Sequence, residues 1–441
     1  MKQSREISRA APLKPSLLVG DASRREVWAW AMYDFANSGY TTVVITAVFN
    51  AYFVSVVAGN AAWATFAWTA ALALSYAAIM VSAPVLGAYA DLRAAKKHLL
   101  LISTVGCVVA TAGLALVGPG DLALGVLFVV VSNFFYGSGE NLIAAFLPEL
   151  AHEDGVGTVS GWGWSFGYLG GLLSLGACLA YIGYAQGQGL GASHFVPVTM
   201  LITAVLFAAA SAPTFLYLHE RTVPQGTMGE AWVTAAFQRL GQTLRHAHEF
   251  PDLRRLLVCI VFYQAGIQAV ITLAAVYAEQ AMKFTTQQTL VLIVVVNLMA
   301  AAGAFGFGYL QDRLGHIRSL SLTLIGWIAM TLLAWSAADA AAFWAAASLA
   351  GICLGASQSA ARAAVAVLSP QTRRAEFFGL WGLAVKLSSI LGPLTYGLVT
   401  WITAGDHRLA ILATGAYFVI GLALLGGVDL TRGKRKAQAT D

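Results

Sequence analysis

Long apolar segments recur along the whole chain, and they restrict the possible folds more than any other feature. A helix needs about 20 mostly apolar residues to cross a bilayer. Twelve segments meet this requirement, at approximately 27–57, 62–90, 98–118, 121–148, 159–184, 194–218, 254–281, 286–311, 319–338, 341–368, 375–403 and 407–429. Only 11% of the 441 residues are charged, against about 25% in an ordinary soluble domain. The sequence therefore predicts an all-α polytopic membrane protein with twelve transmembrane helices.

The positions of the basic residues test this number of spans. If the N-terminus is cytoplasmic and the spans alternate in direction, the 26 Lys and Arg residues all fall on the cytoplasmic side except four. Lys283 and Arg408 lie in outer loops, whereas Arg362 and Lys386 lie within spans. Basic residues concentrate in cytoplasmic loops of membrane proteins. We therefore predict twelve spans with both termini in the cytoplasm.

A polar segment divides the spans into two groups of six. The predicted parts are a cytoplasmic tail at 1–26, a six-helix bundle at 27–218, a cytoplasmic linker at 219–253, a second six-helix bundle at 254–429 and a basic cytoplasmic tail at 430–441. Within the linker, apolar residues from Val233 to Leu244 fall on one helical stripe, which is typical of an amphipathic helix at a membrane surface. This helix could have a regulatory role or simply connect the bundles.

Three motifs recur in the two halves at nearly one spacing. The segments Gly87–Lys97 and Gly308–Arg318 share a glycine and an aspartate at an offset of 221 residues. The prolines that end spans 4 and 10 are 222 residues apart, and Trp-Gly pairs in spans 5 and 11 are 219 residues apart. Two related halves around a midplane site are a transporter architecture.

The two repeated segments resemble the loop 2–3 signature of the major facilitator superfamily. The resemblance implies the fold of that superfamily, in which the aspartate and basic residues latch the two halves together on the cytoplasmic side. An aspartate suits such a place because it can accept hydrogen bonds at a helix N-terminus. The latch residues implied here are Gly87, Asp91, Arg93, Gly308, Asp312 and Arg313. Leu92 stands where an arginine is usual, so we expect the first copy to be weaker.

Two further segments are similar to a narrower subfamily. They run from Trp30 to Tyr40 and from Gly355 to Pro393. This subfamily holds the fungal vacuolar amino-acid effluxers linked to autophagy and bacterial relatives of unassigned substrate. The resemblance implies a transporter, with an amino acid as one candidate cargo and the bacterial inner membrane as the expected location. The chain departs from the pattern at Ala361, where a serine is common, and at Glu140.

Four ionisable residues lie within spans, and Glu376 lies at the beginning of the span that also holds Lys386. A charged side chain at the bilayer centre costs about 2.5–3.5 kcal/mol on insertion scales, so it usually faces a cavity or a partner. We predict coupling or gating roles for Asp34, Glu140 and Glu376. Lys386 could exchange a proton, or serve as a counter-charge for Asp34 or for a substrate anion.

Glu140 and Arg362 occupy equivalent positions of the two halves and carry opposite charges. Each precedes its span-ending proline by eight residues, or roughly 12 Å at 1.5 Å per residue. If both face one central cavity, three interpretations remain open. They form a salt bridge that opens and closes, they clamp the carboxylate and amine of a zwitterion, or they form a permanent pair.

Polar side chains also recur at helical spacing in spans 1 and 7. Amides suit hydrogen bonding to a polar solute, although they also join neighbouring helices. The predicted substrate-binding residues are Glu140, Arg362, Asn37, Gln264, Gln268, Gln358 and Lys386.

The sequence has no Walker loop, no paired metal-ligand motif and no catalytic cluster, so we expect no enzyme activity, cofactor, metal or nucleic-acid partner. We predict a proton-coupled secondary transporter that moves a small polar solute, such as an amino acid or other zwitterion, by alternating access. The alternative is an amphiphilic or lipid-like cargo, which aromatic residues such as Trp162 and Trp164 would favour. A membrane sensor or enzyme is the remaining possibility. The expected partners are the lipid bilayer, the solute and protons, and we expect a monomer.

Overall fold

The structure is a computed structural model that describes residues 17–59, 61, 63–224, 249–284, 286–404 and 406–439. Within these residues, twelve helices are long and apolar enough to cross a membrane. The predictions of an all-α membrane protein and of twelve spans are therefore confirmed. The predicted amphipathic helix of the linker lies outside the described residues.

The first six spans are continuous or nearly continuous helices. Their elements are α1 (Arg24–Tyr40) with η1 (Thr41–Ala47), α2 (Val48–Tyr52) and η2 (Phe53–Val57), α3 (Ala64–Arg93), α4 (Lys96–Gly113) with η3 (Leu114–Leu116), α5 (Leu122–Ala144) with the short α6 (Leu147–Leu150), α7 (Val156–Gly187) and α8 (Ala192–Tyr217). We call this group the first half.

The other six spans form the second half. They are α10 (Pro251–Gln280), α11 (Thr286–Leu314), α12 (His316–Ser336), α13 (Ala340–Leu368), α14 (Arg374–Ile402), which follows η5 (Gln371–Arg373), and α15 (His407–Leu425). A short basic helix, α16 (Leu430–Gln438), follows the last span.

The helical period of the first span changes along its length. Residues Thr41–Ala47 form a π-helix, and Phe53–Val57 form a second one. The first of these begins in a run of β-branched residues, which lose side-chain freedom in an α-helix. The hydroxyl of Thr46 donates to the carbonyl of Thr41 at 3.0 Å, five residues back, which matches the π period. Short π segments occur often at functional sites, and this one directly follows the polar stretch that holds Asp34.

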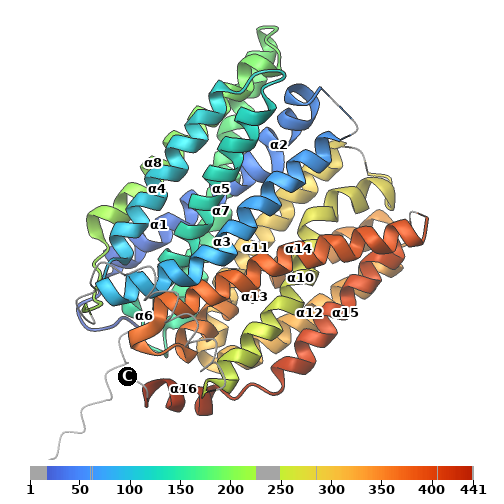
Figure 1. Cartoon of the computed structure of the whole chain (residues 1–441). Helices are drawn as coiled ribbons and strands as arrows, with labels where there is room; N and C mark the ends of the chain where they lie inside the picture. The colour runs from blue at the N-terminus through green and yellow to red at the C-terminus, as the bar shows by residue number, and fades with distance from the viewer. Residues whose placement is uncertain are drawn as a thin grey trace, which may run out of the picture.

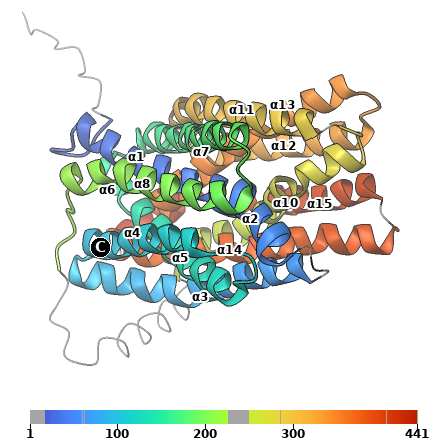
Figure 2. The same ribbon diagram turned by 90° about the horizontal axis from the view of Figure 1, so that it is seen from above.

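The two halves pack against each other along two lines. Helix α7 contacts α11 along one line, and α3 contacts α14 along the other. In Figure 1 the first half, blue to green, lies at the upper left, and the second half, yellow to red, at the lower right. Figure 2 shows α7 beside α11 at one edge of the bundle and α3 beside α14 at the other.

Both described ends of the chain lie on one side of the bundle, which we call the terminal side. Leu18 forms an isolated β-bridge with Ala151 in the loop before α7. Lys434 of α16 forms an ion pair with Glu153 of the same loop. Figure 1 shows α6 and α16 together at this side, at the lower left. The terminal side is thus the end at which α1 begins and α13 finishes.

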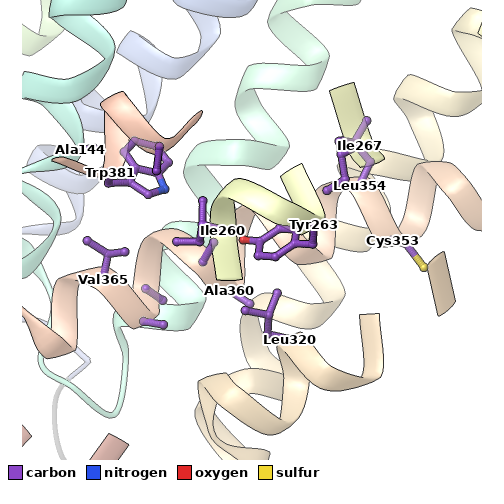
Figure 3. Packing of buried hydrophobic residues seen from close by; sticks show 14 of the residues in the cluster. Ala144, Ile260, Tyr263, Ile267, Leu320, Cys353, Leu354, Ala360, Val365 and Trp381 are labelled. Atoms are coloured by element: carbon purple, nitrogen blue, oxygen red, sulfur yellow. The ribbon is translucent and has the colours of Figure 1, made fainter. Parts of the chain in front are cut away.

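A large apolar cluster fills much of the terminal side and runs from one half into the other. It includes Ala144 of the first half and Tyr263, Leu320, Cys353 and Trp381 of the second. Figure 3 shows how side chains from several helices meet there. This packing fixes the helices whose charged residues are described next.

Candidate functional site

In the described part of the chain, two ion pairs join a membrane-spanning helix of the first half to a membrane-spanning helix of the second. Arg362 of α13 donates from Nη1 to Oδ2 of Asp34 on α1, at 2.6 Å. Lys386 of α14 donates from Nζ to Oε2 of Glu140 on α5, at 3.1 Å. All four residues lie within membrane-spanning helices, where a charge without a partner is costly.

This pairing corrects one expectation from the sequence. Glu140 and Arg362 do not form a salt bridge with each other, because each is paired with another residue. The reason is the packing of their helices: α13 lies against α7, which places Arg362 beside Ser160, whereas α5 lies against α14. Lys386, considered as a counter-charge for Asp34, is the partner of Glu140.

The Asp34–Arg362 pair is enclosed by protein. Arg362 also donates from Nε to the hydroxyl of Ser160 at 3.2 Å and from Nη2 to its carbonyl at 2.9 Å. Its guanidinium carbon lies 4.7 Å from the ring centroid of Trp30 and 5.2 Å from that of Trp164, within the range of cation–π attraction. The side chains of Arg362 and Asp34 are 3% and 12% exposed.

Glycine at position 163 makes this enclosure possible. A Cβ atom there would lie 2.5 Å from Nη2 of Arg362 and 2.7 Å from the Trp30 ring. Only a residue without a side chain leaves space for the guanidinium at this point of α7. The Trp-Gly pair of span 5, which marked the internal repeat, therefore has a packing role beside the charge.

The Glu140–Lys386 pair is more open. Its side chains are 21% and 8% exposed. The ion pair places the Glu140 carboxylate where α5 meets α14. The Nζ atom of Lys386 lies 5.5 Å from the ring centroids of both Tyr76 and Tyr136. This pair thus has one carboxylate and two aromatic faces around one ammonium group.

The predicted amide residues divide into two kinds. Gln264 donates from Nε2 to Oε1 of Gln358 at 2.7 Å, so these two side chains bond to each other. Gln268 is half-buried one turn further along α10. Both amide atoms of Asn37 are buried and have no hydrogen-bond partner among the described residues. Since buried polar groups are nearly always bonded, Asn37 is the one of these predicted amides best placed to bond a solute or water, and Asn141 of α5 shares this property.

The predicted latch aspartates lie at helix N-termini of the opposite half. Asp91 accepts from the backbone N–H groups of Ala375 and Glu376 at 3.2 and 3.0 Å, at the start of α14. Asp312 accepts from those of Gly157 and Thr158 at 2.8 and 2.7 Å, at the start of α7. A carboxylate is stabilised at this end of a helix, so each contact joins the halves on the terminal side.

The two latch glycines allow the backbones to approach at these contacts. A Cβ atom on Gly87 would lie 2.9 Å from Cα of Glu376, and one on Gly308 would lie 3.2 Å from Cα of Gly161. Arg93 and Arg313 are exposed. The Glu376 carboxylate accepts from Arg373 at 3.0 Å in the first turn of α14, on the terminal side.

Helices α7 and α11 also meet through aromatic side chains. Trp162 donates from Nε1 to the hydroxyl of Tyr309 at 3.1 Å, and Gly161 packs against the backbone of Gly308. A lateral opening between these two helices would favour a lipid-like cargo. The contact between Trp162 and Tyr309 closes the interface of α7 and α11 near the terminal side, so it gives no support to a lipid-like cargo.

Sequence reasoning missed several residues of this site. Tyr76, Tyr136 and Ser160 contact the ion pairs but belong to no motif, because aromatic and hydroxyl residues are common in any membrane span. Trp30 begins the segment that resembles the transporter subfamily, and this position could have marked it as a residue of the site. In the part of the chain that the structure describes, no three His, Cys, Asp or Glu side chains could together hold a metal ion.

Comparison with known protein families matches the chain to the family described as "Vacuole effluxer Atg22 like", over residues 51–158 and 156–438. The chain belongs to this family. Among curated relatives it is 27% identical over 405 residues to the uncharacterized MFS-type transporter YxiO of Bacillus subtilis, covering 91% of this chain and 94% of that one. It is 23% identical over 380 residues to autophagy-related protein 22 of Kluyveromyces lactis, covering 78% of this chain and 74% of that protein.

Solved structures with the same fold are also transporters. The human organic anion transporter MFSD10 superposes with a TM-score of 0.71 at 14% identity, covering 91% of this chain and 99% of that one. The proton:xylose symporter XylE gives a TM-score of 0.64 at 17% identity, covering 93% and 96%. These identities establish the fold alone. Together with the family, they show that the protein is a membrane transporter of the major facilitator type.

Proposed function

We propose that this transporter moves a small zwitterion, such as an amino acid, by alternating access between its two halves, and that protons are coupled to the movement. The observation that carries the proposal is that the Asp34–Arg362 and Glu140–Lys386 ion pairs each join one half to the other. When the halves separate at this depth, each charge loses its partner, and a buried charge without a partner is strongly unfavourable. A zwitterion can compensate, because it brings one charge of each sign.

We propose that the terminal side faces the cytoplasm, in the inner membrane of a bacterium. The concentration of basic residues on this side supports the orientation. The contacts of Asp91 and Asp312 hold the halves together there. The described conformation would then be closed toward the cytoplasm, and cargo would reach the ion pairs from the opposite side.

Proton coupling follows from the same two pairs. A carboxylate that loses its cationic partner in a poorly solvated place can be neutralised by a proton. Glu140 is the better candidate, because its side chain is 21% exposed whereas that of Asp34 is 12% exposed. A proton and the ammonium group of the cargo would then compete for one carboxylate, which links the two movements.

The test is transport by the purified protein in liposomes, with and without a pH gradient, using a panel of labelled amino acids and other zwitterions. We expect transport of at least one member that responds to the gradient and falls at least tenfold in E140Q and R362Q. The matched control is D121N, which changes an exposed loop carboxylate that accepts a hydrogen bond from the backbone of Gly118. Wild-type transport rates in both E140Q and R362Q would contradict the proposal.

A further inference from the structure

We infer that Tyr76, Tyr136 and Glu140 form a subsite for a primary ammonium group, and that Lys386 is its tethered occupant in this conformation. We call these three residues the ammonium cage. The inference rests on the proposed function, because it assigns one group of the proposed cargo to one place. It adds a specificity-determining role for Lys386, which competes with the cargo for the cage.

The cage has the composition that an alkylammonium group requires. The Nζ atom of Lys386 lies 3.1 Å from Oε2 of Glu140 and 5.5 Å from the ring centroids of Tyr76 and Tyr136. Aromatic faces within about 6 Å attract ammonium groups, and more strongly when water is excluded. A sodium or calcium ion would instead require several oxygen ligands. The observed occupant shows directly that a primary ammonium group fits.

Contacts within the first half hold the Tyr136 wall of the cage in place. Tyr136 stacks on Tyr40, with ring centroids 5.1 Å apart, and the Tyr40 and Ser132 hydroxyls share a hydrogen bond of 2.8 Å. Gly137 lets α5 pack closely on α3, since a Cβ atom there would lie 2.5 Å from Cδ1 of Ile79. The position of Tyr136 therefore does not depend on Lys386, and such preorganisation lowers the cost of binding.

The occupant, by contrast, comes from the second half. Tyr76 lies on α3, Tyr136 and Glu140 lie on α5, and Lys386 lies on α14. Any movement that separates α14 from α5 withdraws the ammonium group and leaves a carboxylate and two ring faces without a cation. A free ammonium group of the cargo has the same chemistry as the lysine end, so it can take the vacated place. Arg362 differs, because Ser160 also holds it against the first half.

The test replaces the tethered ammonium group with a free one. The full-length K386A variant is purified in detergent, and its melting temperature is measured with n-propylammonium chloride or sodium chloride at equal ionic strength. Propylammonium matches the atoms that the truncation removes. We expect it to raise the melting temperature of K386A by about 2 °C or more relative to sodium, and 1-propanol to give no such rise.

Two matched variants make the result specific. K386M also lacks the charge but fills the same space, and K386A/E140Q lacks the carboxylate of the cage, so neither should distinguish propylammonium from sodium. Equal responses of K386A and K386M, or no response of K386A, would overturn the inference. If K386A is not recovered folded in sodium buffers, its recovery in propylammonium but not in propanol becomes the expected result, and no such rescue overturns the inference.

Transport measurements separate this inference from the proposed function. A protein that moves zwitterions, but whose K386A variant ignores propylammonium, would retain the proposed function and lose the cage. A propylammonium effect specific to K386A, in a protein that moves no zwitterion, would retain the cage and overturn the proposed cargo.

Discussion

The two ion pairs of this transporter both join the halves inside the membrane, but their surroundings differ. Arg362 has three of its N–H groups bonded to Asp34 and Ser160, and its guanidinium lies near two tryptophan rings. Lys386 has one carboxylate partner and two tyrosine rings, and Glu140 keeps 21% exposure. A charged residue in a membrane span can therefore have one of several roles. The Asp34–Arg362 pair braces the interface between the halves, whereas the Glu140–Lys386 pair leaves space for a competing ammonium group.

We expect the largest loss of stability when the enclosed Arg362 is replaced. R362Q removes the guanidinium and leaves Asp34 buried without its partner, which we expect to lower the free energy of unfolding by about 3–5 kcal/mol. R435Q, at an exposed arginine of α16, is the control and should leave stability unchanged. Thermal melting in detergent measures both variants. If R362Q is as stable as the wild type, Arg362 does not brace the interface.

Each ion pair has a glycine beside it, and replacing that glycine with alanine tests how tightly the pair is packed. In G163A the new Cβ atom would meet the guanidinium of Arg362 and the Trp30 ring, and we expect a cost of about 1–3 kcal/mol from overpacking. In G137A it would meet chiefly the flexible end of Ile79, so the cost should be smaller. Thermal melting of the two variants, measured in parallel, compares these losses of stability. A larger loss in G137A than in G163A would contradict the tighter packing around Arg362.

Asp312 joins the two halves through hydrogen bonds to backbone N–H groups and without an ion pair. D312N weakens two hydrogen bonds to the first turn of α7, and loss of such a cap costs about 1 kcal/mol. We also expect the space between the halves to open more often on the terminal side. Labelling of a cysteine introduced at Ala304, which is buried where α11 meets α7, measures this opening once the four native cysteines are replaced. An unchanged labelling rate would show that Asp312 does not control it.

The smallest expected effect on stability is the joint removal of the open pair. E140Q/K386M replaces both charges together, so no buried charge is left alone, and such replacements are often close to neutral. We expect a stability within about 1 kcal/mol of the wild type, with transport of an ammonium-bearing cargo lost. Unchanged transport with unchanged stability would show that the open pair does not meet the cargo.

The spans and the charged residues could be predicted from the sequence because their signals are local. Apolar runs and the positions of basic residues are properties of neighbouring positions in the chain, and they determined all twelve spans. The four intramembrane charges stood out for the same reason, since each interrupts an apolar run.

The partners of those charges could not be predicted in the same way. Glu140 and Arg362 are equivalent in the repeat, but a contact depends on which helices of the two halves lie side by side. The packing of α13 against α7 and of α14 against α5 sets the partners, and it arises from contacts more than 200 residues apart in sequence, such as that of Arg362 with Ser160. Tyr76 and Tyr136 likewise become recognisable only beside the ammonium group of Lys386.

The last helix has a practical consequence for the preparation of the protein. Helix α16 is fixed to the second half where Arg432 donates to Asp252 at 2.8 and 2.6 Å, and Lys434 extends to Glu153 of the first half. An affinity tag or fluorescent protein fused after α16 would lie next to a helix that contacts both halves. A cleavable fusion would allow transport to be measured after the tag has been removed.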